Sequence, residues 1–261
     1  MNANSDPQPD VVKLVSTITR DGLRLDGALH RAALSEHTGP ALLILHGTGS
    51  NFYAPGPLET LAQKASLAGW PALRVNTRGH DGIATIPGSP RGVQGGATFE
   101  SVADCPFDIS AWINFLCGTE VGANEAAMSS QVLLVGHSMG GVKAIYSQVV
   151  APDPRVSGIV CLSPPRFCHE YWMQHSDAEP FRRTFEHAMQ LVSKGHPNEL
   201  IVCRQPVPFV ATAQGFIEKY GPSDSFDIIK LVPRVPCPVL ILIGSHTIAA
   251  SPAFDSLPGE L

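Results

Sequence analysis

Long apolar runs are missing from this chain of 261 residues. The longest, "ALLIL" (41–45) and "VLILI" (239–243), are far shorter than the roughly 20 apolar residues that a membrane-spanning helix needs. The first ten residues, "MNANSDPQPD", contain no basic segment followed by an apolar stretch, so they do not resemble a secretory signal. The sequence therefore predicts a cytoplasmic protein without a membrane span.

Paired cysteines and long runs of like charge are also missing. The six cysteines are scattered without a Cys-x-x-Cys pair, which argues against a zinc site and favours reduced thiols. Charged residues make up only 16% of the chain and the net charge is −5, so we expect no binding to nucleic acid or to an anionic membrane. Nothing in the sequence calls for a metal ion or another cofactor.

What the chain does contain is a series of short, almost wholly apolar runs that alternate with segments of helical length. Strands buried on both faces look like this, and strand–helix alternation indicates a mainly parallel, doubly wound α/β sheet. An N-terminal hairpin is predicted around Asp21-Gly22. The predicted buried strands are 41–47, 71–76, 131–136, 156–163 and 237–245, and the predicted helices between them are 56–69, 106–118 and 139–150.

Residues 165–233 interrupt this alternation. They contain no strong strand pattern, and helices are predicted over 176–195 and through 208–221. We interpret this segment as a helical cap inserted over one end of the sheet. The predicted organisation is a flexible tail (1–10), the first part of the core (11–164), the cap (165–233), and the last recognisable core strand with a tail (234–261).

The pattern Gly-x-Ser-x-Gly occurs at 136–140, "GHSMG". A buried strand precedes it and a helix follows it, as in a nucleophile elbow that holds a serine hydroxyl at the carboxyl end of a sheet. Ser138 is therefore the predicted catalytic nucleophile. The alternative, that these glycines merely allow close helix packing, is less consistent with the strand–turn–helix context.

A serine hydrolase also needs N–H groups that face the oxyanion of the tetrahedral intermediate. We predict that Met139, directly after the nucleophile, and Thr48, in the loop after strand 41–47, supply them. His46 is expected to orient that loop by hydrogen bonding. In the next loop, "NTRGHDG" (76–82), Arg78 and Asp81 are expected to hold the backbone by ion pairing.

Together these motifs, in this order, resemble the α/β-hydrolase superfamily over about residues 12–250. The resemblance implies an α/β-hydrolase fold, acyl transfer to water through Ser138 and no cofactor. It does not imply a particular substrate, because this fold hosts many chemistries.

The carboxyl end departs from the family pattern of Ser, then Asp or Glu, then His. Thr247 stands where the acid is expected, and Asp255 is a poor replacement. No histidine follows His246, so the chain is predicted to be C-terminally truncated, without the family's last strand and catalytic histidine. His246 is the least unfavourable substitute base. Strand 239–243 would then lie exposed at the edge of the sheet, and we expect it to allow self-association.

Three hypotheses follow. The chain is a serine hydrolase acting on a small ester, thioester or related acyl substrate; or it is a non-catalytic member that binds a ligand or partner, or has no function; or it is an incomplete version of an active enzyme. The motif at Ser138 favours descent from an active enzyme, and the departures after residue 244 favour loss of activity.

Overall fold

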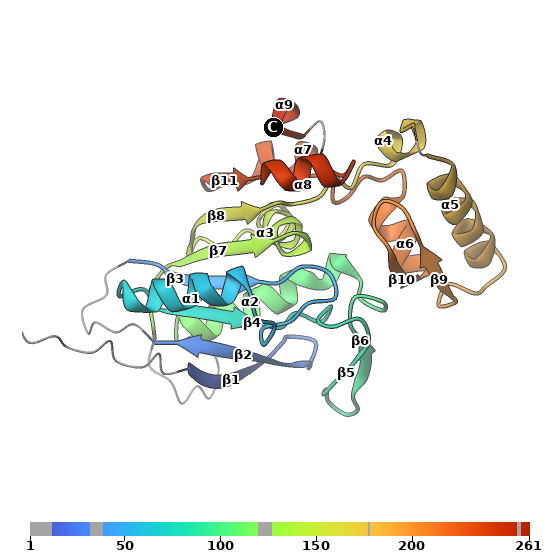
Figure 1. Ribbon diagram of the computed structural model, residues 1–261. Coiled ribbons are helices and arrows are strands. Elements are labelled where there is room, and N and C mark those ends of the chain that lie inside the picture. Colours follow the sequence, from blue (N-terminus) through green and yellow to red (C-terminus); the bar gives the residue numbers. More distant parts are fainter. Residues whose placement is uncertain (1–11, 32–38, 120–126, 177, 255–256) are drawn as a thin grey trace, which may run out of the picture.

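A seven-stranded sheet dominates the computed structural model, which describes residues 12–31, 39–119, 127–176, 178–254 and 257–261 (Figure 1). The strand order is β1-β2-β4-β3-β7-β8-β11. The predicted 1–10 tail lies outside the described residues. The strands of this sheet are β1 (Val12–Ile18), β2 (Arg24–His30), β3 (Ala41–Leu45), β4 (Ala72–Val75), β7 (Val132–His137), β8 (Val156–Leu162) and β11 (Val239–Leu242).

The sheet is parallel from β4 to β11 and antiparallel only at β1 and β2. The turn between β1 and β2 contains Gly22 at φ 84°, a left-handed conformation that glycine adopts without steric cost. All five residues of β3 are buried, as expected for a strand covered on both faces. The structure thus confirms the predicted mainly parallel α/β class.

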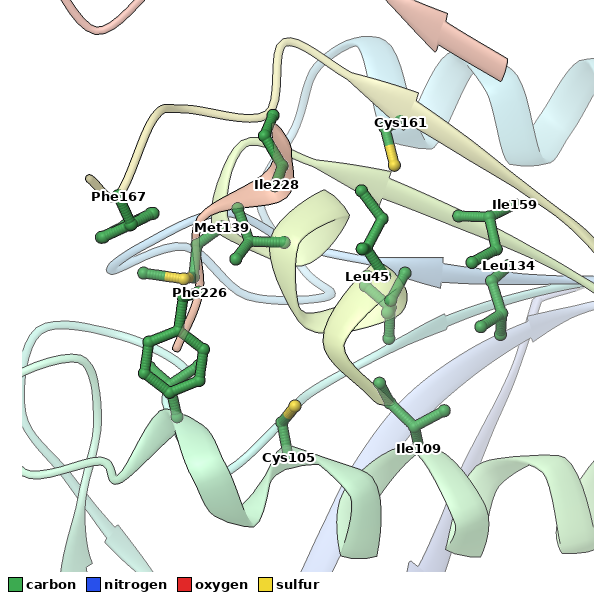
Figure 2. Packing of buried hydrophobic residues seen from close by; sticks show 14 of the residues in the cluster. Leu45, Cys105, Ile109, Leu134, Met139, Ile159, Cys161, Phe167, Phe226 and Ile228 are labelled. Atoms are coloured by element: carbon green, nitrogen blue, oxygen red, sulfur yellow. The ribbon is translucent and has the colours of Figure 1, made fainter. Parts of the chain in front are cut away.

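Helices cover both faces of this sheet (Figure 1). Leu42 and Ile44 of β3 pack with Ala62 of α1 on one face. Leu43 and Leu45 point the other way, into the larger core beneath α2 and α3. The side chains in that core come from strands, helices and the cap together (Figure 2). The core helices are α1 (Pro57–Leu67), α2 (Cys105–Leu116) and α3 (Met139–Val150).

The described residues of the segment that we interpret as a cap (165–233) lie at the end of the sheet where the parallel strands terminate (Figure 1). The cap contains the predicted first helix, observed as α5 (Ala178–Ser193), beside α4 (His169–Gln174), α6 (Ala213–Tyr220) and α7 (Ile228–Leu231). The prediction of a helix through 208–221 is only half right. Its first residues form β10 (Phe209–Thr212), which pairs antiparallel with β9 (Leu200–Cys203).

A half-buried hairpin explains that difference. Cys203 and Ala211 are buried while Val202 and Val210 are exposed. This alternation is typical of strands with one buried and one solvent-exposed face. Thr212 then ends the strand and caps α6, because its hydroxyl accepts a hydrogen bond from the N–H of Gly215. The cap is therefore helical with a two-stranded hairpin. A second small hairpin, β5 (Ala84–Ile86) and β6 (Val93–Gly95), extends from the core.

β11 is shorter than the predicted strand 237–245, because Ser245 already begins α8 (Ser245–Ala250). A last short helix, α9, spans Leu257–Glu260. Two 3₁₀ turns, Val102–Asp104 and Val232–Arg234, complete the elements. None of the helices in the described ranges is long and apolar enough to cross a membrane.

β11 forms one edge of the seven-stranded sheet within the described residues. Leu240 and Leu242 on it are 52% and 50% exposed. Exposed apolar edges favour pairing with a second chain, so self-association through β11 stays a prediction. Sedimentation should show a dimer that Leu240→Lys converts to monomer; a monomer at all concentrations would contradict it.

Candidate active site

Ser138 occupies a sharp turn between β7 and α3. Its backbone has φ 53° and ψ −122°, a left-handed conformation that non-glycine residues rarely adopt. Its N–H donates a hydrogen bond of 2.8 Å to the carbonyl of Leu162, which ties the turn to β8. Local strain of this kind is characteristic of functional turns, and it presents the serine side chain at the carboxyl end of the sheet.

Two glycines make this turn possible. A Cβ on Gly136 would lie 2.3 Å from the backbone carbonyl carbon of Gly140. A Cβ on Gly140 would lie 2.5 Å from the carbonyl oxygen of Leu45. Both contacts are with backbone atoms, which cannot swing away like the end of a side chain. The close approach of α3 to β7 and β3 therefore requires glycine at both positions.

Gly140→Ala should lower the free energy of unfolding by about 1–3 kcal/mol, because the added methyl group must displace the backbone of β3. Urea denaturation would measure the change. Gly82→Ala is the matched control, since a Cβ there meets nothing within 4 Å, and it should change stability by less than about 0.5 kcal/mol. Equal stability of the two variants would contradict the prediction, because it would mean that the backbone around Gly140 can accommodate a methyl group.

The two predicted oxyanion residues lie beside Ser138. The loop after β3 comes so close that a Cβ on Gly47 would lie 3.0 Å from the Cβ of Ser138. Thr48, Ser138 and Met139 line one cavity of about 200 Å³. Met139 also begins α3, a helix of 12 residues whose first N–H groups have no partners within the helix and carry its positive dipole end.

This cavity lies between core and cap. Most of its wall is apolar, and its charged members are Arg166 and Lys219. Phe167, Phe209 and Tyr220 come from the cap, and Phe254 follows α8. The full lining is Thr48, Ser138, Met139, Pro165, Arg166, Phe167, Pro206, Val207, Phe209, Lys219, Tyr220, Ser251, Ala253 and Phe254.

None of the histidines in the described ranges lines the Ser138 cavity. His246 is exposed at the start of α8. His137 adjoins Ser138 in sequence but lines a separate cavity of about 170 Å³, together with His46. Thr247 is half-buried, and Asp255 lies outside the described residues. The structure thus brings Ser138, Thr48 and Met139 together and leaves His246 apart from them.

A family model described as "Alpha/beta hydrolase family" matches residues 42–257. The chain belongs to the alpha/beta hydrolase family. No curated protein matches this hydrolase significantly in sequence. The sequence-level resemblance drawn from the motifs around Ser138 is thereby confirmed.

Solved structures agree on the fold of this α/β hydrolase. GrgF from Penicillium sp. sh18, an alpha/beta hydrolase, is 17% identical with a TM-score of 0.62, and the match covers 90% of each chain. The Pyrococcus furiosus esterase Pf2001 is 17% identical with a TM-score of 0.54, over 92% of this chain and 73% of that one. Est1E from Butyrivibrio proteoclasticus, solved with ferulic acid, is 16% identical with a TM-score of 0.53, over 87% and 77%.

A buried ionic cluster of Glu100, Lys143 and Lys219 reaches the Ser138 cavity of this α/β hydrolase, because Lys219 lines that cavity. Nζ of Lys143 lies 2.6 Å from Oε2 of Glu100 and donates a hydrogen bond of 3.0 Å to the hydroxyl of Thr77. Nζ of Lys219 lies 3.6 Å from Oε1 of Glu100 and donates to the carbonyl of Ala97 at 3.2 Å. Burial acts to raise the pKa of Glu100, but the charges of Lys143 and Lys219 outweigh it and lower that pKa.

Sequence analysis missed this cluster, because its members are scattered along the chain. The one available signal is Lys143 inside the otherwise apolar stretch "GVKAIY" of α3. A lysine on the buried side of a helix needs a carboxylate partner, but the sequence does not say which one.

His46 joins this cluster to the loop after β3, which contains Thr48. Its Nδ1 lies 2.8 Å from the carbonyl oxygen of Gly47, and its Nε2 accepts a hydrogen bond from the N–H of Thr77 at 3.2 Å. This pattern fits the neutral ring protonated at Nδ1. Burial lowers the pKa of His46 to about 4, and the charge of Lys143 acts in the same direction. The structure shows the loop-orienting hydrogen bonds that the sequence predicts for His46.

This lowered pKa predicts a stability loss in mild acid. Between pH 6.5 and about 4 the unfolded chain binds a proton at residue 46 that the folded chain does not. The contribution is therefore fully present above pH 6.5 and is lost as pH falls toward 4, about 3 kcal/mol in all. Urea denaturation across this range should show a shallower pH dependence for His46→Asn than for the wild type; parallel curves would contradict the prediction.

The loop at 76–82 is held by two separate groups of contacts. Arg78 is buried and forms an ion pair of 2.8 Å with Asp108, and a second of 2.9 Å with Asp21. Asp81 instead accepts hydrogen bonds from Asn51 and Tyr53 and lies beside His80. The predicted ion pairing is thus confirmed for Arg78, but its partners lie elsewhere in the chain and do not include Asp81.

One group of potential metal ligands occurs in the described ranges of this hydrolase, formed by Cys168, Asp224 and Asp227. The carboxylates of the two aspartates already accept hydrogen bonds within the protein. Asp224 accepts hydrogen bonds from the N–H of His169 and from Lys230, and Asp227 caps the N-terminus of α7. These contacts account for the cluster without a metal ion.

Proposed function

We propose that this α/β hydrolase cleaves a small ester or related acyl substrate by nucleophilic attack of Ser138. The observation that carries the proposal is the strained Ser138 turn, held by backbone contacts of Gly136 and Gly140, at the wall of a largely apolar cavity. Backbone strain of this size persists only where the surrounding structure enforces it, and it aims the hydroxyl into the cavity.

In the proposed reaction, Oγ of Ser138 attacks the carbonyl carbon and its proton passes to a base. The N–H groups of Thr48 and Met139 stabilise the oxyanion, assisted by the positive end of α3. The alcohol leaves with a proton, and water then hydrolyses the acyl-enzyme. His246 is the base we propose from the sequence. Because its ring is exposed outside the cavity lining, α8 would have to move for it to reach Ser138.

A covalent probe tests this function. A fluorophosphonate, which reacts with activated serines, should add its mass to the peptide that contains Ser138, and p-nitrophenyl acetate should be hydrolysed. His246→Ala should then lower both rates if His246 is the base. Labelling at full rate in His246→Ala would show that His246 is not the base, although Ser138 is still an activated nucleophile.

A second candidate function is ligand binding without catalysis. The observation that favours it is that none of the described histidines lines the Ser138 cavity. Without a base, serine is a weak nucleophile at neutral pH. Under this alternative the fluorophosphonate leaves Ser138 unmodified and ester hydrolysis stays at the rate of the uncatalysed reaction, while the folded protein still binds ligands in the cavity.

A further inference from the structure

The charged side chains that line the Ser138 cavity are both cationic. Arg166 and Lys219 contribute to its wall, and no aspartate or glutamate of the described residues does. The charge of Arg166 is balanced by Glu260, whose two carboxylate oxygens lie 2.7 and 2.8 Å from its two terminal nitrogens. The charge that matters for a ligand is therefore that of Lys219.

The positive charge of Lys219 is only partly balanced by the nearby carboxylate of Glu100. Its residue is 2% exposed, and Oε1 of Glu100 lies 3.6 Å from Nζ, beyond hydrogen-bond distance. The other oxygen of Glu100 is engaged by Lys143 at 2.6 Å. Two lysines thus share one carboxylate, and in the described structure Ala97 offers the one acceptor within hydrogen-bond distance of Nζ of Lys219. An ammonium group has three N–H donors, so capacity remains for a ligand.

The surroundings of Lys219 strengthen its attraction for an anion. The ring centroid of Phe209 lies 5.6 Å from Nζ, and the other cavity walls are largely apolar. Water screens a charge poorly in such a site. Burial lowers the pKa of Lys219, which means that its charged form lacks sufficient stabilisation. A bound carboxylate would supply that stabilisation and form a charge-assisted hydrogen bond.

We propose that Lys219 makes the cavity selective for acyl groups that end in a carboxylate, such as those of dicarboxylic acid monoesters. This selectivity affects catalysis only if Ser138 cleaves esters, so the proposal rests on the proposed function. The ester carbonyl lies at Ser138 and the distal carboxylate at Lys219, because both residues line the same cavity. The small volume of about 200 Å³ favours short acyl chains.

Binding can be measured without hydrolysis in Ser138→Ala. Isothermal titration calorimetry would compare the monomethyl esters of succinate, glutarate and adipate with the corresponding dimethyl esters. At least one monomethyl ester should bind ten times or more tightly than its dimethyl ester. The second substitution Lys219→Met should remove this preference. Lys230→Met, which removes an exposed lysine of α7 outside the cavity, should preserve it.

Circular dichroism would show whether the double variant is folded, with Lys219→Gln as the replacement if Lys219→Met is not. Equal affinity for charged and neutral esters in Ser138→Ala overturns the proposal whatever those variants do. Selective binding that survives the loss of Lys219 overturns it too. Selective binding without any hydrolysis by the wild type would instead sustain this site and reject the proposed function.

Discussion

Ser138→Ala is expected to reduce ester hydrolysis by between about 10³ and 10⁶, to the level that the oxyanion site and binding alone provide. The reason is that Oγ forms the covalent bond to the acyl group, and no neighbouring hydroxyl takes its place on the turn. Initial rates with p-nitrophenyl acetate, measured for both proteins at equal concentration, would check the prediction.

The control for this experiment is Ser251→Ala, which removes another hydroxyl from the lining of the same cavity. It should retain the wild-type rate within a few-fold. Equal rates for wild type and Ser138→Ala would assign any observed hydrolysis to other residues and support the non-catalytic alternative.

Glu100→Gln is expected to lower the free energy of unfolding by about 3–5 kcal/mol, the range for removing one partner of a buried ion pair. The side chain of Glu100 is fully buried, and it is the carboxylate that Lys143 and Lys219 share. Glutamine keeps the size and one carbonyl oxygen but leaves two lysines without an opposing charge. Urea denaturation at pH 7 would measure the loss.

Glu179→Gln is the matched control. Its carboxylate pairs with Arg183 on the exposed surface of α5, where both side chains are largely in water. The same chemical change there should cost no more than about 0.5 kcal/mol. A comparable small loss in Glu100→Gln would mean that water reaches the cluster, which would also weaken the case for anion selectivity at Lys219.

The sheet and the sharp turn at Ser138 could be predicted from the sequence because both depend on local sequence patterns. The run "ALLIL" specifies a strand buried on two faces, and "GHSMG" between a strand and a helix specifies the turn at Ser138. The half-buried β9–β10 hairpin was missed because its strands are four residues each and its polar positions are few.

The ionic cluster could not be predicted, because its members meet only after folding. Glu100 and Lys143 are separated by 43 positions in the sequence, and Lys219 lies on α6 of the cap. Which lysine pairs with which carboxylate depends on how α3, the cap and the loop before α2 pack together. The hydrophobic periodicity of a single segment does not indicate how that segment packs against the others.

The path of the chain around the cap suggests how this protein could diversify. β8 and β11 pair directly with each other, although the whole cap intervenes between them in the sequence. Changes to exposed residues of this interval therefore leave the register of the sheet and the turn at Ser138 unchanged, as long as the buried side chains that the cap contributes to the core, such as Phe226 and Ile228, are kept. Directed evolution confined to this interval could change which ligands the Ser138 cavity accepts while the sheet stays constant, provided that Glu100 keeps a cationic partner.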